Sequence, residues 1–279
     1  MTLYLVGLGP GSLEHLTLRA AEVLKSSQAV VGYGPYVDLV DGWFPDPARR
    51  AIRGTLGQED ARAGDAIRLA CDEGLRVALV SSGDAGLYGM GGPLFRRLLE
   101  DGWDGHHPAV EVVPGVTAAL SANALLGAPV ADDVALISLS DILTPWSVIA
   151  QRLEAAAQAD FVVALYNPAS TRRRRGLQEA QRILLRHRPP DTPVALVRNA
   201  LRAETSVCVT TLADLPHAQV DMLTLLIVGN EQTVRVGRDQ LVSCRARQQS
   251  TPGPDTRDAP PATSRPLDFS SLPPLAGPR

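Results

Sequence analysis

The residues best placed to do chemistry lie in the run SSGDAGLYGM, from Ser81 to Met90. This run carries one carboxyl group, on Asp84, and one phenol, on Tyr88, among three glycines. The preceding segment, Val77–Val80, is apolar and predicts a buried strand, and in open α/β sheets ligands bind where strands end. We therefore expect a ligand at this loop. The alternative is an ordinary strand-to-helix turn in which Asp84 bonds to its own backbone.

A second glycine-rich loop favours ligand binding over a simple turn. GLGPGS, from Gly7 to Ser12, directly follows the apolar segment Thr2–Val6, which predicts the first strand. Glycines in such loops let the backbone approach a ligand closely. A binding function is therefore the preferred interpretation of both loops.

The order strand, glycine loop, helix and strand at the start of the chain invites comparison with dinucleotide-binding folds. That fingerprint needs GxGxxG and an acid at the end of the second strand. Here Ser12 stands where the last glycine belongs, and the predicted strand Ala29–Gly32 runs into GYGPY with no acid before Asp38. Pro10 also removes a backbone N–H from the loop. An NAD-binding oxidoreductase remains an alternative of a different class.

The elements that must position these loops alternate between strands and helices, which predicts an α/β fold. The first half should hold a mostly parallel sheet and the second half a mixed one, because strands are closely spaced there. Predicted strands are Thr2–Val6, Ala29–Gly32, Ala51–Arg53, Val77–Val80, Val110–Val113, Ala135–Leu139, Phe161–Tyr166, Val194–Arg198, Val207–Thr211 and Leu223–Val228. Predicted helices are Thr17–Ser27 capped by Thr17, Glu59–Asp72, Pro93–Glu100 with Leu94, Leu98 and Leu99 inward, Thr117–Leu126, Val148–Ala157 and Thr171–Arg188.

Length favours two domains, since 279 residues exceed one small core. We expect an N-terminal α/β domain over residues 1–126 and a C-terminal one over 127–245. Residues 246–279 hold 8 of the 22 prolines and few large apolar groups, which is typical of a disordered tail.

Composition excludes several classes of function. The 27 basic and 30 acidic residues give a net charge of −3, so no general field recruits nucleic acid or a membrane surface. The start of the chain lacks signal-peptide character and no apolar run reaches transmembrane length, so the cytoplasm is expected. The three cysteines are scattered and the pair His106–His107 lies in a polar loop, so no metal site is expected.

Several sequence blocks together resemble the tetrapyrrole methylases of corrin and siroheme synthesis. They are GLGPGS, GDAGLYGM, PGVTA at Pro114–Ala118, and the late strand TLLIVGN. The match is closest to members that methylate C(17) of precorrin-3B. It rests on VVGYGPYVDLV, GAPVADDVALISLSDILTPW and DFVVALYNPASTRRR, and covers roughly residues 1 to 245.

The resemblance implies two α/β/α domains of the tetrapyrrole methylase type, with the active site in the inter-domain cleft. It implies S-adenosyl-L-methionine as methyl donor, held largely by backbone groups. By position, the donor would be bound by Pro10, Gly83, Asp84, Ala85, Leu87, Tyr88, Thr117, Ala118, Tyr166, Asn167 and Ala200. Small residues suit close approach to an adenosine, and Thr117 offers a hydroxyl.

The resemblance further implies methylation at C(17) with contraction of the macrocycle, in cobalamin biosynthesis. Contraction needs proton transfers, for which the candidates are Asp84, Tyr88, Ser138, Ser140, Asp141 and Thr144. Ser140 and Asp141 have an alternative role as a helix cap before Trp146.

The substrate would be a tetrapyrrole with many carboxylates. Arg172, in the basic run Arg172–Arg175, and Ser138 are the candidate substrate-binding residues, because arginine binds carboxylates in a bidentate way. One alternative for the run is the exposed first turns of a helix, and another is a nucleic-acid contact, although the run lacks interleaved aromatic residues. A methylase of another ring position, C(11) or C(20), is the nearest rival, and family resemblance suggests a homodimer.

Overall fold

Five parallel strands organise the first half of the chain in the computed structural model, which describes residues 2–169, 175–215 and 219–244. The strands are β1 (Thr2–Gly7), β2 (Ala29–Tyr33), β3 (Arg50–Gly54), β4 (Val77–Ser81) and β5 (Ala109–Val113). Their order in the sheet is β3-β2-β4-β1-β5, and every neighbouring pair is parallel. The carboxyl ends of β1, β4 and β5 therefore meet at one edge.

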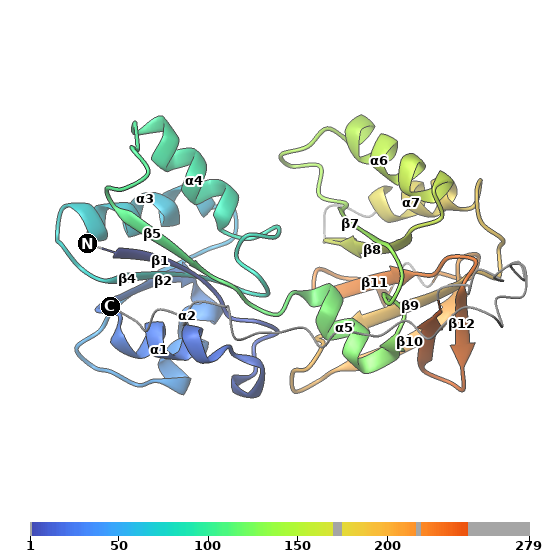
Figure 1. Ribbon diagram of the computed structural model, residues 1–279, viewed down its shortest axis with the longest axis horizontal. Helices are drawn as coiled ribbons and strands as arrows, with labels where there is room; N and C mark the ends of the chain where they lie inside the picture. Colours follow the sequence, from blue (N-terminus) through green and yellow to red (C-terminus); the bar gives the residue numbers. More distant parts are fainter. Residues whose placement is uncertain (1, 170–174, 216–218, 245–279) are drawn as a thin grey trace, which may run out of the picture. The chain divides into compact units, whose positions relative to one another are not determined.

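Helices cover both faces of this first sheet (Figure 1). α1 (Leu18–Ser26) and α2 (Gly34–Trp43) lie on one face, and α3 (Glu59–Cys71) and α4 (Gly91–Glu100) lie on the other. Side chains alternate along each strand, so Leu3 and Leu5 pack with α3 and α4 whereas Val6 packs with α1 and α2. A strand buried on both faces reads as a continuous apolar run, as β4 does.

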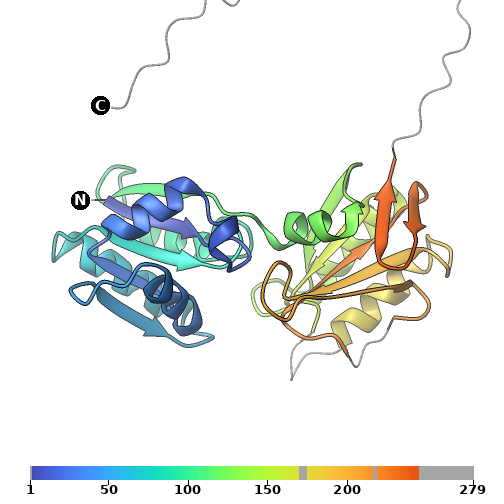
Figure 2. The same ribbon diagram turned by 90° about the horizontal axis from the view of Figure 1, so that it is seen from below.

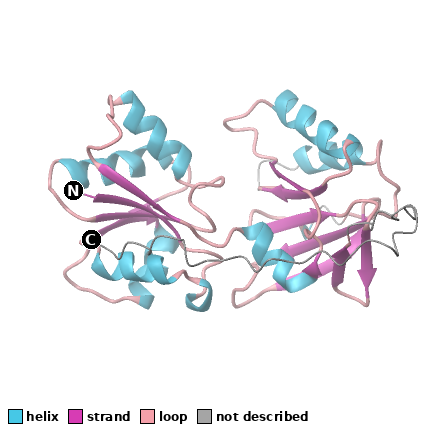
Figure 3. Cartoon of the chain, in the orientation of Figure 1, coloured by secondary structure: helices cyan, strands magenta, loops and turns pink. Residues whose placement is uncertain are grey.

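The second half contains a separate mixed sheet, which Figure 3 shows as a second group of strands. Its strands, in the spatial order β10-β9-β11-β8-β7, are β7 (Val134–Ser138), β8 (Val162–Tyr166), β9 (Pro193–Arg198), β10 (Ser206–Thr211) and β11 (Thr224–Val228). Only β7 and β8 are parallel among these pairs, and the other three pairs are antiparallel. The expected contrast between the two halves is confirmed.

One helix covers one face of the second sheet and two cover the other. α5 (Ala118–Leu126) packs on the face that carries Val162 and Ala164. Figure 2 shows the same helix in green against the second sheet. α6 (Trp146–Gln158) and α7 (Arg175–Leu184) pack on the face that carries Val163 and Leu165. Three short strands form a small third sheet, namely β6 (Gly127–Ala128), β12 (Thr233–Val236) and β13 (Gln240–Ser243), and η1 (Leu13–His15) is a single 3-10 turn.

The structure corrects three of the sequence predictions. α2 was not expected, because Gly34 and Pro35 read as a loop, yet proline suits the first helical turn and the helix begins there. Leu99 does not point inward but is 66% exposed, since Leu94 and Leu98, four residues apart, already occupy the buried stripe. The last helix ends at Leu184 rather than Arg188.

The predicted Thr17 cap is confirmed, because its side chain accepts a hydrogen bond from the Ala20 N–H at 3.1 Å. Among the described residues, none of the helices combines the length and the apolar character that a bilayer crossing requires.

The two sheets lie on either side of residues 126 and 127 in the sequence, but residues 1–245 cluster as one compact unit. The division into domains at this point therefore remains a proposal. The expected tail, residues 246–279, lies outside the described residues.

Candidate functional site

Four glycines, Gly7, Gly9, Gly83 and Gly115, pack backbone against backbone where β1, β4 and β5 end. Gly9 and Gly83 exchange two hydrogen bonds, with N···O distances of 3.0 Å and 2.7 Å. A Cβ on Gly7 would lie 2.7 Å from the Gly83 carbonyl oxygen, and one on Gly115 would overlap the same atom. Gly9 and Gly83 also adopt positive φ angles of 63° and 62°. The glycines of three separate sequence blocks therefore serve one close junction.

Asp84 ties this junction together through its carboxylate. Its Oδ1 accepts a hydrogen bond from the Gly86 N–H at 2.9 Å, and its Oδ2 accepts one from the Gly115 N–H at 3.1 Å. The first bond is the local turn contact that the sequence offered as an alternative. The second joins the loop after β4 to the loop after β5, which are 31 residues apart in the chain.

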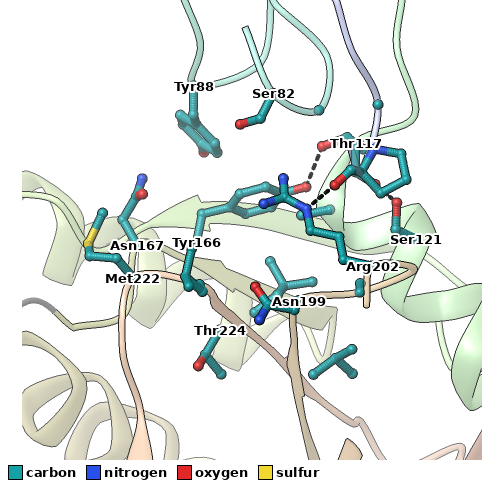
Figure 4. Close-up of a pocket in the computed structure, with 18 of the residues that line it drawn as sticks. Ser82, Tyr88, Thr117, Ser121, Tyr166, Asn167, Asn199, Arg202, Met222 and Thr224 are labelled. Atoms are coloured by element: carbon teal, nitrogen blue, oxygen red, sulfur yellow. Dashed lines mark hydrogen bonds between the residues drawn. The ribbon is translucent and has the colours of Figure 1, made fainter. Parts of the chain in front are cut away.

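Beside the junction lies a pocket lined from both halves of the chain (Figure 4). From the first half come the loops after β1 and β4 and the start of α2, and from the region between the sheets comes the start of α5. From the second half come the ends of β8 and β9 and the start of β11. Its lining residues are Gly9, Pro10, Tyr36, Ser82, Gly83, Leu87, Tyr88, Thr117, Ala118, Ser121, Tyr166, Asn167, Val197, Asn199, Ala200, Arg202, Met222, Leu223, Thr224 and Leu225.

Two tyrosines stand at the centre of the pocket wall. The Tyr166 hydroxyl lies 2.7 Å from the Thr117 hydroxyl and accepts a hydrogen bond from the Ala119 N–H at 3.0 Å. The Tyr88 ring contacts the Tyr166 ring with centroids 5.1 Å apart, and its hydroxyl donates to the Leu136 carbonyl at 2.7 Å. Burial raises the pKa of both phenols above their usual range, so both are neutral at physiological pH.

Tyr88 holds a backbone conformation that side chains rarely adopt, with a φ of 54°. Strain of this kind costs about 1–3 kcal/mol and persists where surrounding contacts enforce it. Here the hydroxyl bond to Leu136 and the contact with Tyr166 hold the ring in place. The loop after β4 is thereby attached to the second sheet.

A further link across the pocket comes from Arg202, whose Nε–H donates to the Pro10 carbonyl (Figure 4). Arg202 follows β9 in the loop Asn199–Thr205, where the Thr205 hydroxyl bonds to the carbonyls of Asn199 and Arg202 at 2.8 Å and 2.7 Å. Asn199 and Leu201 adopt positive φ angles in this loop. The pocket is thus a built site with defined walls.

Comparison with known proteins identifies the scaffold. A family model described as tetrapyrrole (corrin/porphyrin) methylases matches residues 2–216. The chain belongs to this family. The fold and the enzyme class expected from the sequence are confirmed.

Two curated relatives of this methylase illustrate the match. One from Priestia megaterium, a cobalt-factor III methyltransferase, is 48% identical over 83% of this chain, and the match spans 42% of the relative's length. One from Salmonella typhimurium, a probable cobalt-factor III C(17)-methyltransferase, is 42% identical over 83% of this chain and 93% of its own. The chain therefore spans less than half of one relative and nearly all of the other.

Solved structures agree with this assignment of the methylase. The crystal structure of the methyltransferase CobJ superposes with a TM-score of 0.81 at 33% identity, covering 87% of this chain and 99% of the other. Uroporphyrin-III C-methyltransferase from Thermus thermophilus, complexed with S-adenosyl homocysteine, gives a TM-score of 0.60 at 25% identity, covering 82% and 94%.

Most of the residues that the sequence predicted as donor-binding in the methylase line this pocket. They are Pro10, Gly83, Leu87, Tyr88, Thr117, Ala118, Tyr166, Asn167 and Ala200. Two predicted residues do not line it. Ala85 is fully buried beneath the loop, and both carboxylate oxygens of Asp84 are occupied by backbone N–H groups at the junction. Whether Asp84 transfers a proton stays a prediction.

The predicted substrate-side residues of the methylase lie apart from the pocket lining. The Ser138 hydroxyl accepts hydrogen bonds from Asn167 Nδ2 at 3.0 Å and from the Ser140 N–H at 3.2 Å, so it borders a lining residue. Ser140, Asp141 and Thr144 lie in the following loop and do not line the pocket. Neither Ser140 nor Asp141 caps α6, whose N-cap residue is Pro145 without a side-chain cap. Arg172 lies outside the described residues.

Several lining residues were missed by the sequence analysis. Tyr36 belongs to the unexpected helix α2, and Ser82 stands inside the run already singled out. Asn199 and Arg202 follow a predicted strand in the segment RNALRAE, where an asparagine after a strand could have suggested a tight turn. Within the described part of the chain, no group of His, Cys, Asp or Glu residues is arranged to hold a metal ion.

Proposed function

We propose that this chain transfers a methyl group from S-adenosyl-L-methionine to C(17) of a precorrin-3B or cobalt-precorrin-3 type tetrapyrrole, with ring contraction, in cobalamin biosynthesis. The observation that carries the proposal is that one pocket is lined both by Gly83, Leu87 and Tyr88, from the loop after β4, and by Tyr166 and Asn167, although the first sheet supplies that loop and the second sheet the other two residues. The relatives named cobalt-factor III methyltransferases support the choice of ring position and favour a cobalt-containing substrate.

The pocket suits an adenosyl donor in its residue types. Gly9, Gly83, Ala118 and Ala200 leave backbone accessible, and Leu87, Val197 and Leu225 supply apolar surface for a base. Among the described residues that line it, Arg202 carries the only charged side chain. The hydroxyl of Ser82 can bond to ribose, whereas those of Thr117 and Thr224 already bond to Tyr166 and Asp221.

When bound, the donor supplies an electrophilic methyl group on a sulfonium, which is already a good leaving group. The residues of the chain then need to orient it and exclude water, which together can lower the barrier by several kcal/mol. The junction of Gly7, Gly83 and Gly115 fixes the loops that do this. The proton transfers of ring contraction are proposed to use Asp84, Tyr88, Ser140, Asp141 and Thr144. The residues proposed to bind the substrate are Ser138 and Arg172.

A ligand titration tests the class of the enzyme. Calorimetry should show binding of S-adenosylhomocysteine and none of NADH. Binding of NADH alone would replace this proposal with an oxidoreductase, the alternative of a different class.

A turnover assay tests the ring position. The chain should add one methyl to a precorrin-3 type substrate, supplied with and without cobalt, and shift its absorbance as the ring contracts. A methylated product with an uncontracted ring would reject C(17) in favour of another position such as C(11) or C(20).

We also propose that the chain acts as a cytoplasmic homodimer, in line with the family resemblance. Gel filtration coupled to light scattering measures the oligomeric state, and a mass of one chain would reject the dimer. Fractionation of the source cells tests the cytoplasmic location.

A further inference from the structure

Arg202 combines three features that the donor-binding role of the pocket does not by itself require. It is the only charged residue among those that line the pocket within the described part of the chain. Its Nε–H is used by the Pro10 carbonyl, and no carboxylate among the described residues forms an ion pair with it. Arg198, on the preceding strand, differs in this respect because it pairs with Asp221 at 2.8 Å.

The guanidinium of Arg202 packs closely against the backbone of Gly11. Gly11 adopts a φ of 104°, and a Cβ there would lie 2.9 Å from Arg202 Nε. The loop that carries Arg202 is stabilised by the hydrogen bonds of the Thr205 hydroxyl to its carbonyl groups. The guanidinium is therefore held by the Gly-rich loop on one side and by its own loop on the other.

The remaining donors of the side chain are the two Nη groups. A guanidinium has five N–H donors in a rigid fork, and a carboxylate matches that fork with two parallel hydrogen bonds. Once Nε is committed to Pro10, the Nη end remains for a ligand. Because a partly buried charge is costly without a partner, an arginine that faces a pocket and has no ion pair favours the binding of an anion there.

We propose that the Nη end of Arg202 binds a ligand carboxylate in this pocket while its Nε–H holds the Pro10 carbonyl. This rests on the proposed function, in which both ligands carry carboxylates. The donor has one, at the end of its amino acid chain, and the tetrapyrrole has several at its rim. A cation close to a sulfonium would weaken binding, so the guanidinium should meet the donor at its carboxylate end.

The two sources of the carboxylate are separated with a pair of probes. S-adenosylhomocysteine carries the amino acid carboxylate, and 5′-methylthioadenosine lacks it but keeps the adenosine and sulfur. Their Kd values are measured by calorimetry for the wild-type chain, Arg202→Gln, Arg202→Lys and the surface control Arg182→Gln, whose guanidinium pairs with Glu179 on α7. The KM for the tetrapyrrole is measured on the same proteins.

If Arg202 binds the donor carboxylate, Arg202→Gln should weaken S-adenosylhomocysteine about tenfold to hundredfold and change methylthioadenosine by less than about threefold. Arg202→Lys should recover part of the loss, because charge remains but the fork is gone. If the carboxylate belongs to the macrocycle, the KM for the tetrapyrrole should rise by a similar factor while both nucleosides bind as before. Arg182→Gln should change none of these values.

Equal losses for both nucleosides in Arg202→Gln would show that the residue only shapes the pocket, and would overturn the proposal. Unchanged affinities together with an unchanged KM would overturn it as well. A wild-type chain that binds neither nucleoside contradicts the proposed function itself, and the role of Arg202 falls with it.

Discussion

The hydroxyl groups of Thr117 and Tyr166 lie 2.7 Å apart, which joins the residue before α5 to the last residue of β8. The same Tyr166 oxygen accepts the Ala119 N–H at 3.0 Å, so a strand of the second sheet satisfies a donor in the first turn of α5. Thr117 itself makes no side-chain cap. One phenol thereby supports both the helix end and the pocket wall.

We expect Tyr166→Phe to lower the free energy of unfolding by about 1–3 kcal/mol, because the buried Ala119 N–H loses its acceptor. Urea unfolding followed by circular dichroism measures this. Tyr4→Phe is the matched control, since Tyr4 has a partly buried ring and no hydroxyl hydrogen bond to the described residues, and it should shift stability by less than about 0.5 kcal/mol. Equal effects from both changes would contradict the bridging role.

Alkaline pH should destabilise the fold through the same group. Burial raises the pKa of Tyr166 above its unfolded value near 10, so the folded chain keeps this proton when the unfolded chain loses it. The stabilising contribution is therefore complete below about pH 10 and is lost as pH rises through the folded pKa, with a limiting slope of about 1.4 kcal/mol per pH unit. Tyr166→Phe should unfold with a shallower dependence between pH 9 and 11. If the free energy of unfolding of Tyr166→Phe depended on pH as steeply as that of the wild type, Tyr166 would not be the group responsible.

The glycine junction should not tolerate a methyl group. Gly115→Ala would place a Cβ against the Gly83 carbonyl oxygen, and relief of that overlap must separate two strand ends. We expect a loss of about 2–4 kcal/mol in stability and weaker binding of S-adenosylhomocysteine. Gly64→Ala in α3 is the control, because nothing lies within 4 Å of its added Cβ, and it should stabilise the helix by about 0.5–1 kcal/mol.

The change Asp84→Asn distinguishes two roles of Asp84, a structural tether between two loops and a group that transfers a proton. Asparagine keeps one oxygen acceptor but presents an NH₂ group to the other backbone N–H, so stability should fall by about 1–2 kcal/mol. If Asp84 acts only as a tether, the pH profile of kcat should keep its shape while the Kd for S-adenosylhomocysteine rises. Loss of one limb of that profile would instead assign it the proton transfer expected from the sequence.

The loop after β7 exposes two large apolar side chains, Ile142 at 73% and Leu143 at 77%. They stand among Ser140, Asp141 and Thr144, the predicted substrate-side residues. We expect the double change Ile142→Ser and Leu143→Ser to raise the KM for a flat tetrapyrrole about tenfold, while S-adenosylhomocysteine binds as before. The matched control is Leu18→Ser, since Leu18 is 92% exposed on α1. A KM that does not change would remove this loop from the substrate site.

The central strands of both sheets were largely predictable because they are buried on both faces and therefore appear as short apolar runs bounded by turn residues. Val77–Ser81 and Val162–Tyr166 are of this type, and each was expected to within one residue at either end. α2 was not predictable in the same way, since its glycine and proline begin a helix here and begin loops elsewhere. The exposure of Leu99 likewise depended on which of two adjacent leucines met the sheet.

The sequence by itself determined the family, the α/β class and most of the pocket's backbone-lined wall, because those depend on glycine spacing and on local apolar pattern. Only the tertiary structure decided that Asp84 bonds across to Gly115, that Tyr166 supports α5, and that Arg202 reaches Pro10 from 192 residues away. These contacts join segments that carry no mark of their partners. Their specificity comes from which strand ends the sheet order brings to the same edge, and that order is set by the packing of the whole chain.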